Sequence, residues 1–382
     1  MARPRETNPF RFGGLALDEA FANREQELAE ITADALAGQD VALFAPRRFG
    51  KSSLMWRASQ ELITAGALVA HVDLMTTPNL GRFAEKLAQT IHEDIASPLF
   101  RARERLRVFA GLRVSPTITV DPDDASVSFG FSGSAASADL AATIERLLEL
   151  PGVLAGERNR PVVLVLDEFQ EVTDIDRTLP RLMRAIFQRQ AEVSHIYLGS
   201  RRHAMQTIFS NENEPFWRST KRTELGLIAP ERFGPFLTQR FAQTGRRMDD
   251  EATAHLLQIT GGHPYATQEL SYFVWQRIGP RRIADRADVD AALGDVLRSE
   301  DSHFTTVWER TSAQQRSLLS ALAREGGRPL STEFRRRHNL PTASSVQRAL
   351  HTLEGAELIA RDGGRAWISE PFLADWLRSR GF

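Results

Sequence analysis

A glycine, a lysine and a serine follow one another shortly after an apolar run in this chain. The run covers residues 41–45, and the segment beyond it reads Pro46-Arg47-Arg48-Phe49-Gly50-Lys51-Ser52. This spacing is that of a phosphate-binding loop between a strand and a helix. In such a loop Gly50 allows close approach of the backbone, Lys51 supplies a charge for the β and γ phosphates, and Ser52 offers a hydroxyl to Mg²⁺. The segment therefore predicts a site for ATP with Mg²⁺.

The lysine in this segment is unusual for the chain. Only Lys51, Lys86 and Lys221 are lysines, and arginine is otherwise the cation. A compact ammonium suits phosphate as a point charge, which agrees with the prediction. We expect the nucleotide to contact the following residues: Ala45, Pro46, Arg47, Arg48, Phe49, Gly50, Lys51, Ser52 and Ser53. Ala45 stands where glycine is commoner, and the alternative interpretation is an ordinary glycine turn.

Two acids follow the most apolar segment of the sequence. Residues 162–166 are all valine or leucine, and Asp167-Glu168 come next. In an open parallel sheet the ligand lies at the carboxyl ends of the strands. Asp167 is then placed to hold Mg²⁺ through water, and Glu168 to orient and deprotonate the attacking water as a catalytic base. The alternative is that the two acids merely end a strand.

The order of several segments resembles the archaeal-type ATPases of the STAND group within the AAA+ superfamily. The resemblance includes the two motifs above, the second of which continues as Asp167-Glu168-Phe169-Gln170. The other segments are Arg24-Glu25, Gly199-Ser200-Arg201, Gly261-Gly262-His263-Pro264 and a terminal winged helix. The resemblance implies that the segment at Arg24 lies against the adenine and ribose, that Pro264 touches the nucleotide from a helical lid, and that Ser200 or Arg201 senses the γ-phosphate. Alternatively, the Gly-Gly-His-Pro segment only separates two helices, and Arg201 and Arg202 are solvated surface residues.

Hydrophobic periodicity predicts the elements that hold these residues. Short apolar runs alternate with helical segments up to about residue 228, which predicts an α/β fold with a doubly wound parallel sheet. An inserted hairpin is expected within residues 113–137, as a partner-binding device, an oligomer contact or a decorated loop. A helical lid should follow over residues 229–305. Three helices and a hairpin then predict a winged helix-turn-helix over residues 306–382.

The winged helix has two competing interpretations. Residues 311–382 hold 11 arginines and 7 acids, a mild positive excess. The candidate recognition helix at 343–354 offers side chains for phosphates and base edges, with an arginine run at 335–337 before it. These residues are Ser344, Ser345, Gln347, Arg348, His351, Arg335, Arg336 and Arg337. In the other interpretation, implied by the resemblance, the module packs on the ATPase core and gates nucleotide exchange.

Composition excludes several classes of protein. The 382 residues are 42% hydrophobic and 25% charged with a net charge of −1, which indicates a globular chain without a global field toward nucleic acid or membrane. The absence of cysteine excludes disulfides, iron–sulfur clusters and a cysteine nucleophile. No signal peptide or membrane span is evident, so a cytoplasmic location is expected. No nuclease activity is assigned.

These observations favour an ATP-binding switch with slow hydrolysis, whose nucleotide state repositions the winged helix. One alternative is an ATP-dependent DNA-binding protein of the replication-initiator or transposition-helper type. Another is a signalling or defence scaffold that forms nucleotide-dependent homo-oligomers. The sequence leaves open which of Arg202, Arg218 and Arg222 could serve as an arginine finger.

Overall fold

The computed structural model describes residues 7–16, 21–96, 106–110, 112–114, 117–120, 127–131, 137–280 and 282–382. Contacts divide the chain into two compact units. The sheet unit comprises Arg24–Pro46 and Lys51–Leu225, and the helical unit comprises Met1–Asn23, Arg47–Gly50 and Gly226–Phe382. The tip of the predicted phosphate loop thus groups with the helical unit.

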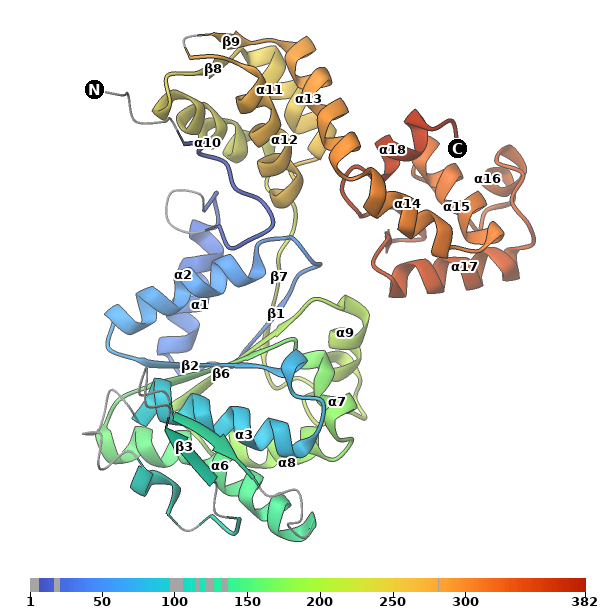
Figure 1. Ribbon diagram of the computed structural model, residues 1–382. Helices are drawn as coiled ribbons and strands as arrows, with labels where there is room; N and C mark the ends of the chain where they lie inside the picture. Colours follow the sequence, from blue (N-terminus) through green and yellow to red (C-terminus); the bar gives the residue numbers. More distant parts are fainter. Residues whose placement is uncertain are drawn as a thin grey trace. The chain divides into compact units, whose positions relative to one another are not determined.

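A parallel five-stranded sheet forms the centre of the sheet unit (Figure 1). In spatial order its strands are β2 (Leu68–Asp73), β5 (Val162–Asp167), β6 (Val193–Gly199), β1 (Val41–Phe44) and β7 (Lys221–Glu224). Asp73 lies opposite Asp167, and Phe44 pairs with Gly199 on one side and Glu224 on the other. The strand ends that carry the predicted site therefore meet along one edge of the sheet.

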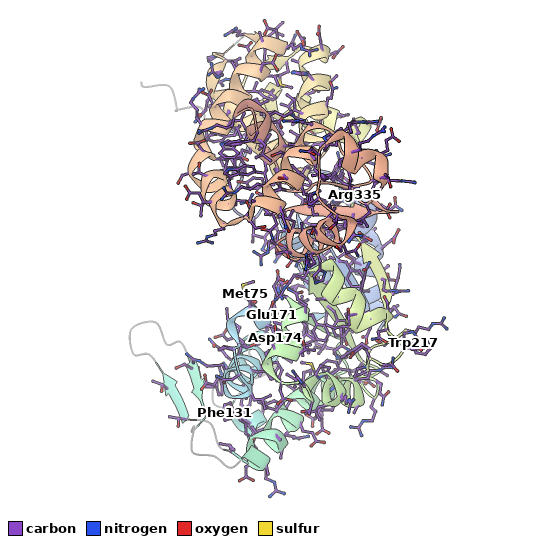
Figure 2. The ribbon with its side chains drawn as sticks, turned by 90° about the vertical axis from the view of Figure 1, so that its right-hand side faces the viewer. Met75, Phe131, Glu171, Asp174, Trp217 and Arg335 are labelled. Carbon is purple, nitrogen blue, oxygen red and sulfur yellow. The ribbon has the colours of Figure 1, made fainter. Side chains whose placement is uncertain are left out.

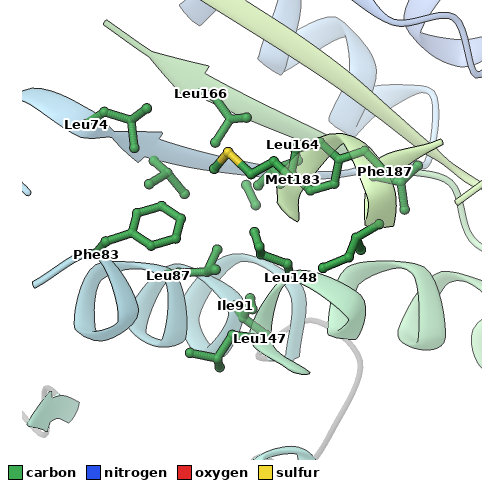
Figure 3. Packing of buried hydrophobic residues seen from close by; sticks show 14 of the residues in the cluster. Leu74, Phe83, Leu87, Ile91, Leu147, Leu148, Leu164, Leu166, Met183 and Phe187 are labelled. Carbon is green, nitrogen blue, oxygen red and sulfur yellow. The ribbon is translucent and has the colours of Figure 1, made fainter. Parts of the chain in front are cut away.

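Helices cover both faces of this sheet, as the doubly wound prediction requires (Figure 1). One face carries α1 (Glu25–Leu36) and α2 (Lys51–Thr64), and the other carries α3 (Leu80–Thr90), α6 (Ser137–Arg158) and α8 (Leu179–Phe187). Figure 3 shows Phe83, Leu87 and Leu148 of these helices packed against Leu164 and Leu166 of β5. Residues 162–166 are completely apolar because a strand covered on both sides has no solvent face. Four shorter helices link the ends of the strands: η2 (Leu74–Thr76), η5 (Phe169–Glu171), α7 (Val172–Ile175) and α9 (Arg202–Ser210).

The sequence does not predict strand β7. Its residues, Lys221 to Glu224, are polar and mostly exposed, and among the described residues they pair with β1 alone. An edge strand has a solvated side and needs no apolar run, so it lacks the signal that identifies the inner strands.

An antiparallel hairpin interrupts the sheet unit between α3 and α6. It consists of β3 (Thr117–Val120) and β4 (Val127–Gly130) and follows the short helices η3 (Ile91–Ala96) and η4 (Leu106–Phe109). Phe129 is buried against Phe109 and His92, with ring centroids 4.9 and 5.6 Å away. The acidic turn at residues 121–124 lies outside the described residues. The hairpin's role as a partner or oligomer contact stays a prediction.

The first part of the helical unit is a group of helices over the segment that the sequence predicts as a lid. It contains α10 (Pro230–Gln243), β8 (Arg247–Met248), α11 (Asp250–Thr260), α12 (Pro264–Arg277), β9 (Ile283–Ala284) and α13 (Arg286–Ser299). The helices surround a core that includes Phe233, Leu256 and Leu270. Phe10, from the N-terminal segment, packs into this core with its ring 4.8 Å from that of Phe241.

The second part of the helical unit confirms the predicted winged helix. It contains α14 (Asp301–Arg310), α15 (Ala313–Arg324), α16 (Thr332–Arg337), α17 (Ala343–Gly355), β10 (Ile359–Asp362), β11 (Arg365–Ile368) and α18 (Leu373–Ser379). Strands β10 and β11 form the antiparallel wing around the turn at Gly363-Gly364, where both residues have positive φ. Its core, with Phe304, Leu319 and Trp376, is continuous with that of the lid.

Candidate nucleotide site

The loop between β1 and α2 is the segment that the sequence predicts to bind phosphate. Strand β1 ends at Phe44 and α2 begins at Lys51. Gly50 has φ +83°, a conformation that side chains rarely adopt, although a Cβ there would meet no atom within 4 Å. Conformation rather than space therefore requires glycine at this position. Ser52, in the first turn of α2, is exposed, whereas Lys51 and Ser53 are buried.

Lys51 and the two predicted acids come together in the sheet unit. The Nζ atom of Lys51 lies 3.3 Å from Oε1 of Glu168 and 3.6 Å from Oδ1 of Asp167. Only 7% of the lysine side chain is exposed, and 17% of each acid. Glu168 has φ 50°, a left-handed conformation that is uncommon for a residue with a side chain. It turns the chain sharply at the end of β5.

Both acids are more acidic than usual despite their partial burial. Burial by itself would raise the pKa of Asp167, but contact with His71 and the charge of Lys51 outweigh it, so the pKa is lowered. Burial likewise opposes the ionisation of Glu168, yet Lys51 and hydrogen bonds from Gln170 and Ser200 lower its pKa. The two carboxylates are therefore ionised at neutral pH, as Mg²⁺ coordination and general-base chemistry require.

The two sensor candidates differ in their surroundings. Ser200 is buried beyond the end of β6, and its Oγ donates a 2.7 Å hydrogen bond to Oε2 of Glu168. Arg201 is half exposed and pairs with Glu171. Of the two residues, Ser200 belongs to the cluster around the predicted base.

The predicted adenine and lid residues lie in different units. Arg24 is buried at the start of α1 and forms a 2.8 Å ion pair with Glu27. Pro264 is the first residue of α12. The two glycines before it have positive φ, and a Cβ on Gly262 would lie 2.1 Å from the carbonyl oxygen of Ile228. This segment thus separates α11 from α12, and the nucleotide contacts of Arg24 and Pro264 stay predictions.

Within the helical unit, two arginines of the loop tip pair with acids of the winged helix. The Nε atom of Arg47 lies 3.0 Å from Glu357, and Nη1 of Arg48 lies 2.5 Å from Glu370. The Arg48 guanidinium also stacks 4.5 Å from the ring centroid of Tyr265. Arg48 has φ 66°, so it occupies a left-handed conformation that these contacts support.

Phe49, the next residue of the loop tip, packs against the lid. Its ring centroid lies 4.6 Å from that of His263, which is buried at the start of α12. Burial and the nearby charge of Arg48 lower the pKa of His263 to about 4. The ring is therefore neutral, and its Nδ1 accepts a hydrogen bond from the backbone N–H of Ala266.

Sequence reasoning missed two residues beside the predicted acids. His71 of β2 lies with its Nε2 atom 3.6 Å from Oδ2 of Asp167. Gln170 is buried and donates a hydrogen bond from Nε2 to Oε2 of Glu168. Gln170 stands in the quoted motif, but only the turn of η5 brings its side chain back toward Glu168. No motif in the sequence singles out His71, which lies in the middle of β2.

The comparisons with known proteins agree with this architecture. A protein-family model described as "Probable winged helix domain" matches residues 302–379. Among solved structures, the Walker-type ATPase PABY2304 of Pyrococcus abyssi superposes with a TM-score of 0.67 at 14% identity, covering 97% of this chain and 99% of that one. The chain has the fold of a P-loop ATPase with a C-terminal winged helix domain.

Other structural matches are weaker. The Aeropyrum pernix ORC1 protein, solved in complex with DNA, has a TM-score of 0.48 and 16% identity over 96% of this chain and 94% of that one. Cdc6p of Pyrobaculum aerophilum has a TM-score of 0.46 and 15% identity over 99% of this chain and 97% of that one. No curated protein matches the sequence. In the described part of the chain, no helix has the length and apolarity to cross a bilayer.

Proposed function

We propose that this protein is an ATP-binding switch that hydrolyses ATP slowly with Mg²⁺, and that its nucleotide state repositions the winged helix. The observation that carries the proposal is the pairing of Arg47 and Arg48 with Glu357 and Glu370. Guanidinium groups bind phosphate as readily as carboxylate. Arginines in a phosphate loop that are paired to the winged helix therefore couple nucleotide binding to the position of that domain.

The residues present fit a magnesium nucleotide. Among the described residues, no three histidine, aspartate or glutamate side chains gather as a cage for a metal ion. Mg²⁺ is commonly held by one or two protein groups together with phosphate oxygens. Asp167 and the exposed Ser52 could supply those groups, and Lys51 the charge for the β and γ phosphates. When bound, Mg²⁺ and ATP supply a polarised γ-phosphoryl group.

Two of the chain's own residues would then serve the attack of water. Glu168 is ionised and can accept a proton at a carboxylate oxygen. Ser200 fixes the other part of that carboxylate through its 2.7 Å hydrogen bond. Ser200 thus holds one oxygen of Glu168, which leaves the other to accept a proton. This arrangement supports Glu168 as the base and Ser200 as a residue near the γ-phosphate. The STAND assignment and an assembly into oligomers belong to the same proposal.

The release of ADP tests the switch. Replacing both Glu357 and Glu370 by glutamine removes the two ion pairs of the loop tip. Partly exposed pairs contribute up to about 1 kcal/mol each, so removing both should change ADP release by up to about thirtyfold. Glu325→Gln is the matched control, because it breaks the ion pair with Arg337 inside the winged helix. Equal ADP release rates in the double variant and in wild type would contradict the coupling.

A second candidate function, duplex DNA binding, is favoured by the outer face of α17. Ser344, Gln347, Arg348 and His351 are all exposed on this helix. Such a face can reach phosphates and base edges in a major groove. Binding to duplex DNA that weakens as salt rises, with or without ATP, is the observation that would support this function.

A further inference from the structure

Glu168 is held by three hydrogen-bond donors from three different segments of the chain. Ser200 Oγ and Gln170 Nε2 both donate to Oε2, while Lys51 Nζ lies 3.3 Å from Oε1. Each carboxylate oxygen has two lone pairs. Oε2 is therefore fully used by Ser200 and Gln170, and Oε1 is the oxygen that remains able to accept a proton from water.

The partner of Oε1 is the charged side chain of Lys51, whereas the partners of Oε2 are the neutral side chains of Ser200 and Gln170. Lys51 is the residue whose charge the phosphates would attract, so its ammonium can turn from Oε1 to a phosphate. Ser200 and Gln170 are buried and follow the ends of neighbouring strands. They would keep hold of Oε2 while Oε1 is released.

Gln170 occupies its place at a cost to stability. Its side-chain Oε1 is buried and has no hydrogen-bond partner among the described residues. An unsatisfied buried acceptor typically costs about 1 to 3 kcal/mol. An ionised carboxylate only accepts hydrogen bonds, so the amide must present its NH₂ group to Glu168. The flipped amide, with its oxygen toward Glu168, is therefore excluded.

The amide is also confined sterically. A Cβ built on Gly199 would lie 2.8 Å from Oε1 of Gln170 and 2.3 Å from Cγ of Met205. The missing side chain of Gly199 thus leaves the space that the Gln170 amide and the Met205 side chain occupy, directly before Ser200. A buried side chain whose oxygen lacks a hydrogen-bond partner does not stabilise the fold. Its presence in a tightly packed position therefore points to a functional role for Gln170.

We propose that Gln170 is a positioning residue that, together with Ser200, fixes Oε2 of Glu168 so that Oε1 is presented to the attacking water. The inference rests on the proposed function, because it concerns the base of that reaction. It assigns Gln170 no contact with the nucleotide. Its loss should therefore slow hydrolysis without weakening ATP binding.

Gln170→Met tests this directly, because methionine has a similar length, has no donor and removes the unsatisfied acceptor. The expected result is a single-turnover hydrolysis rate about tenfold below wild type at saturating ATP, with unchanged ATP affinity. Thermal stability should stay equal or rise, whereas a purely structural glutamine would lose stability on substitution. Gln190→Met is the control, since Gln190 is hydrogen-bonded to the carbonyl of Leu148, away from the site. It should leave the hydrolysis rate unchanged.

A double-mutant cycle with Ser200→Ala measures whether the two residues are coupled in the hydrolysis rate. A purely structural role of Gln170 would give no such coupling. Two donors to one oxygen should be coupled, so the combined variant should lose less rate than the product of the single losses. If Gln170→Met fails to fold, Gln170→Leu, which has neither a donor nor a charge, takes its place in both measurements. A wild-type rate in the folded variant, or strictly multiplicative losses, would overturn the inference. Glu168→Gln serves as the reference: if it too turned over at the wild-type rate, the proposed function rather than the role of Gln170 would be at fault.

Discussion

The Nζ atom of Lys51 lies 3.3 Å from Oε1 of Glu168, so the predicted phosphate ligand and the predicted base are direct partners. One contact thereby joins the start of α2 to the end of β5. Nucleotide binding would draw the lysine toward phosphate and free the carboxylate oxygen. The predictions for these two residues are therefore separable.

Lys51→Ala should remove most of the affinity for ATP. The β and γ phosphates lose the point charge that the loop offers them, and two ionised acids are left without their buried counter-ion. We expect a loss of about 10² or more in affinity by isothermal titration calorimetry. Lys86→Ala on α3 is the matched control and should bind as wild type. A folded Lys51→Ala protein with full affinity would remove the phosphate-loop assignment.

Glu168→Gln should separate binding from chemistry. Glutamine retains the shape of the side chain but cannot take the proton of water, so hydrolysis should slow by roughly 10² or more. ATP affinity should be retained or rise slightly. Measuring both quantities on the same preparation decides the role: undiminished turnover would mean that another group activates the water.

Glu269 of α12 predicts a pH dependence of stability. The residue is completely buried, and neither carboxylate oxygen has a partner among the described residues. Burial, with the charges of Glu300 and Glu370, raises the pKa of Glu269 to about 8, although the charge of Arg48 opposes this shift. Burial and the nearby Glu269 also raise the pKa of Tyr265. Because the folded-state pKa of Glu269 lies above the unfolded value of 4.5, the stabilising contribution is complete below about pH 4.5 and is lost as pH rises toward 8.

Glu269→Gln should remove this loss, because glutamine mimics the protonated acid at every pH. We expect the variant to be more stable than wild type at pH 8, by on the order of a few kcal/mol, and nearly equal to it near pH 4.5. Thermal unfolding across this range measures the difference. The exposed Glu333→Gln should follow the wild-type curve. A constant difference between Glu269→Gln and wild type at all pH values would contradict a titrating Glu269.

DNA binding can be tested by replacing arginines of the winged helix that are exposed and form no ion pair with an acid among the described residues. Arg337 pairs with Glu325 and Glu333, and Arg335, labelled in Figure 2, donates to the carbonyl of Leu330. Arg336 and Arg348 are exposed. If the winged helix binds DNA, replacing Arg336 and Arg348 with alanine should flatten the slope of log affinity against log salt by about 0.9 for each phosphate that is no longer neutralised.

Arg337→Ala is the control for that experiment, because its charge is already neutralised by two acids. It should change the slope little. Titrating a labelled duplex at several salt concentrations gives all the slopes. No binding by wild type even at low salt would leave gating as the function of the winged helix.

The sequence predicts the inner sheet and much of the site because their signals are local. An apolar run followed by Gly50 and Lys51, or by Asp167 and Glu168, identifies both a strand and its chemistry. The edge strand β7 has a solvated side and a polar sequence, so this signal is absent. Ser200 is identified by resemblance, and its hydrogen bond to Glu168 depends on the pairing of β5 with β6.

Contacts between distant segments could not be predicted in this way. The pairs of Arg47 with Glu357 and of Arg48 with Glu370 join residues more than 300 positions apart. Any of the many arginines and acids could have formed such pairs, and composition does not rank them. The role of Gln170 likewise depends on the left-handed turn at Glu168, which the local sequence does not indicate.

A distance measurement reports directly whether the nucleotide state moves the winged helix. The chain contains no cysteine, so Ala185→Cys on α8 and Gln347→Cys on α17, both at exposed positions, give two unique sites for spin labels. In a Glu168→Gln background, double electron–electron resonance should give different distance distributions with ADP and with ATP, both in the presence of Mg²⁺. Superimposable distributions at saturating nucleotide would contradict the switch.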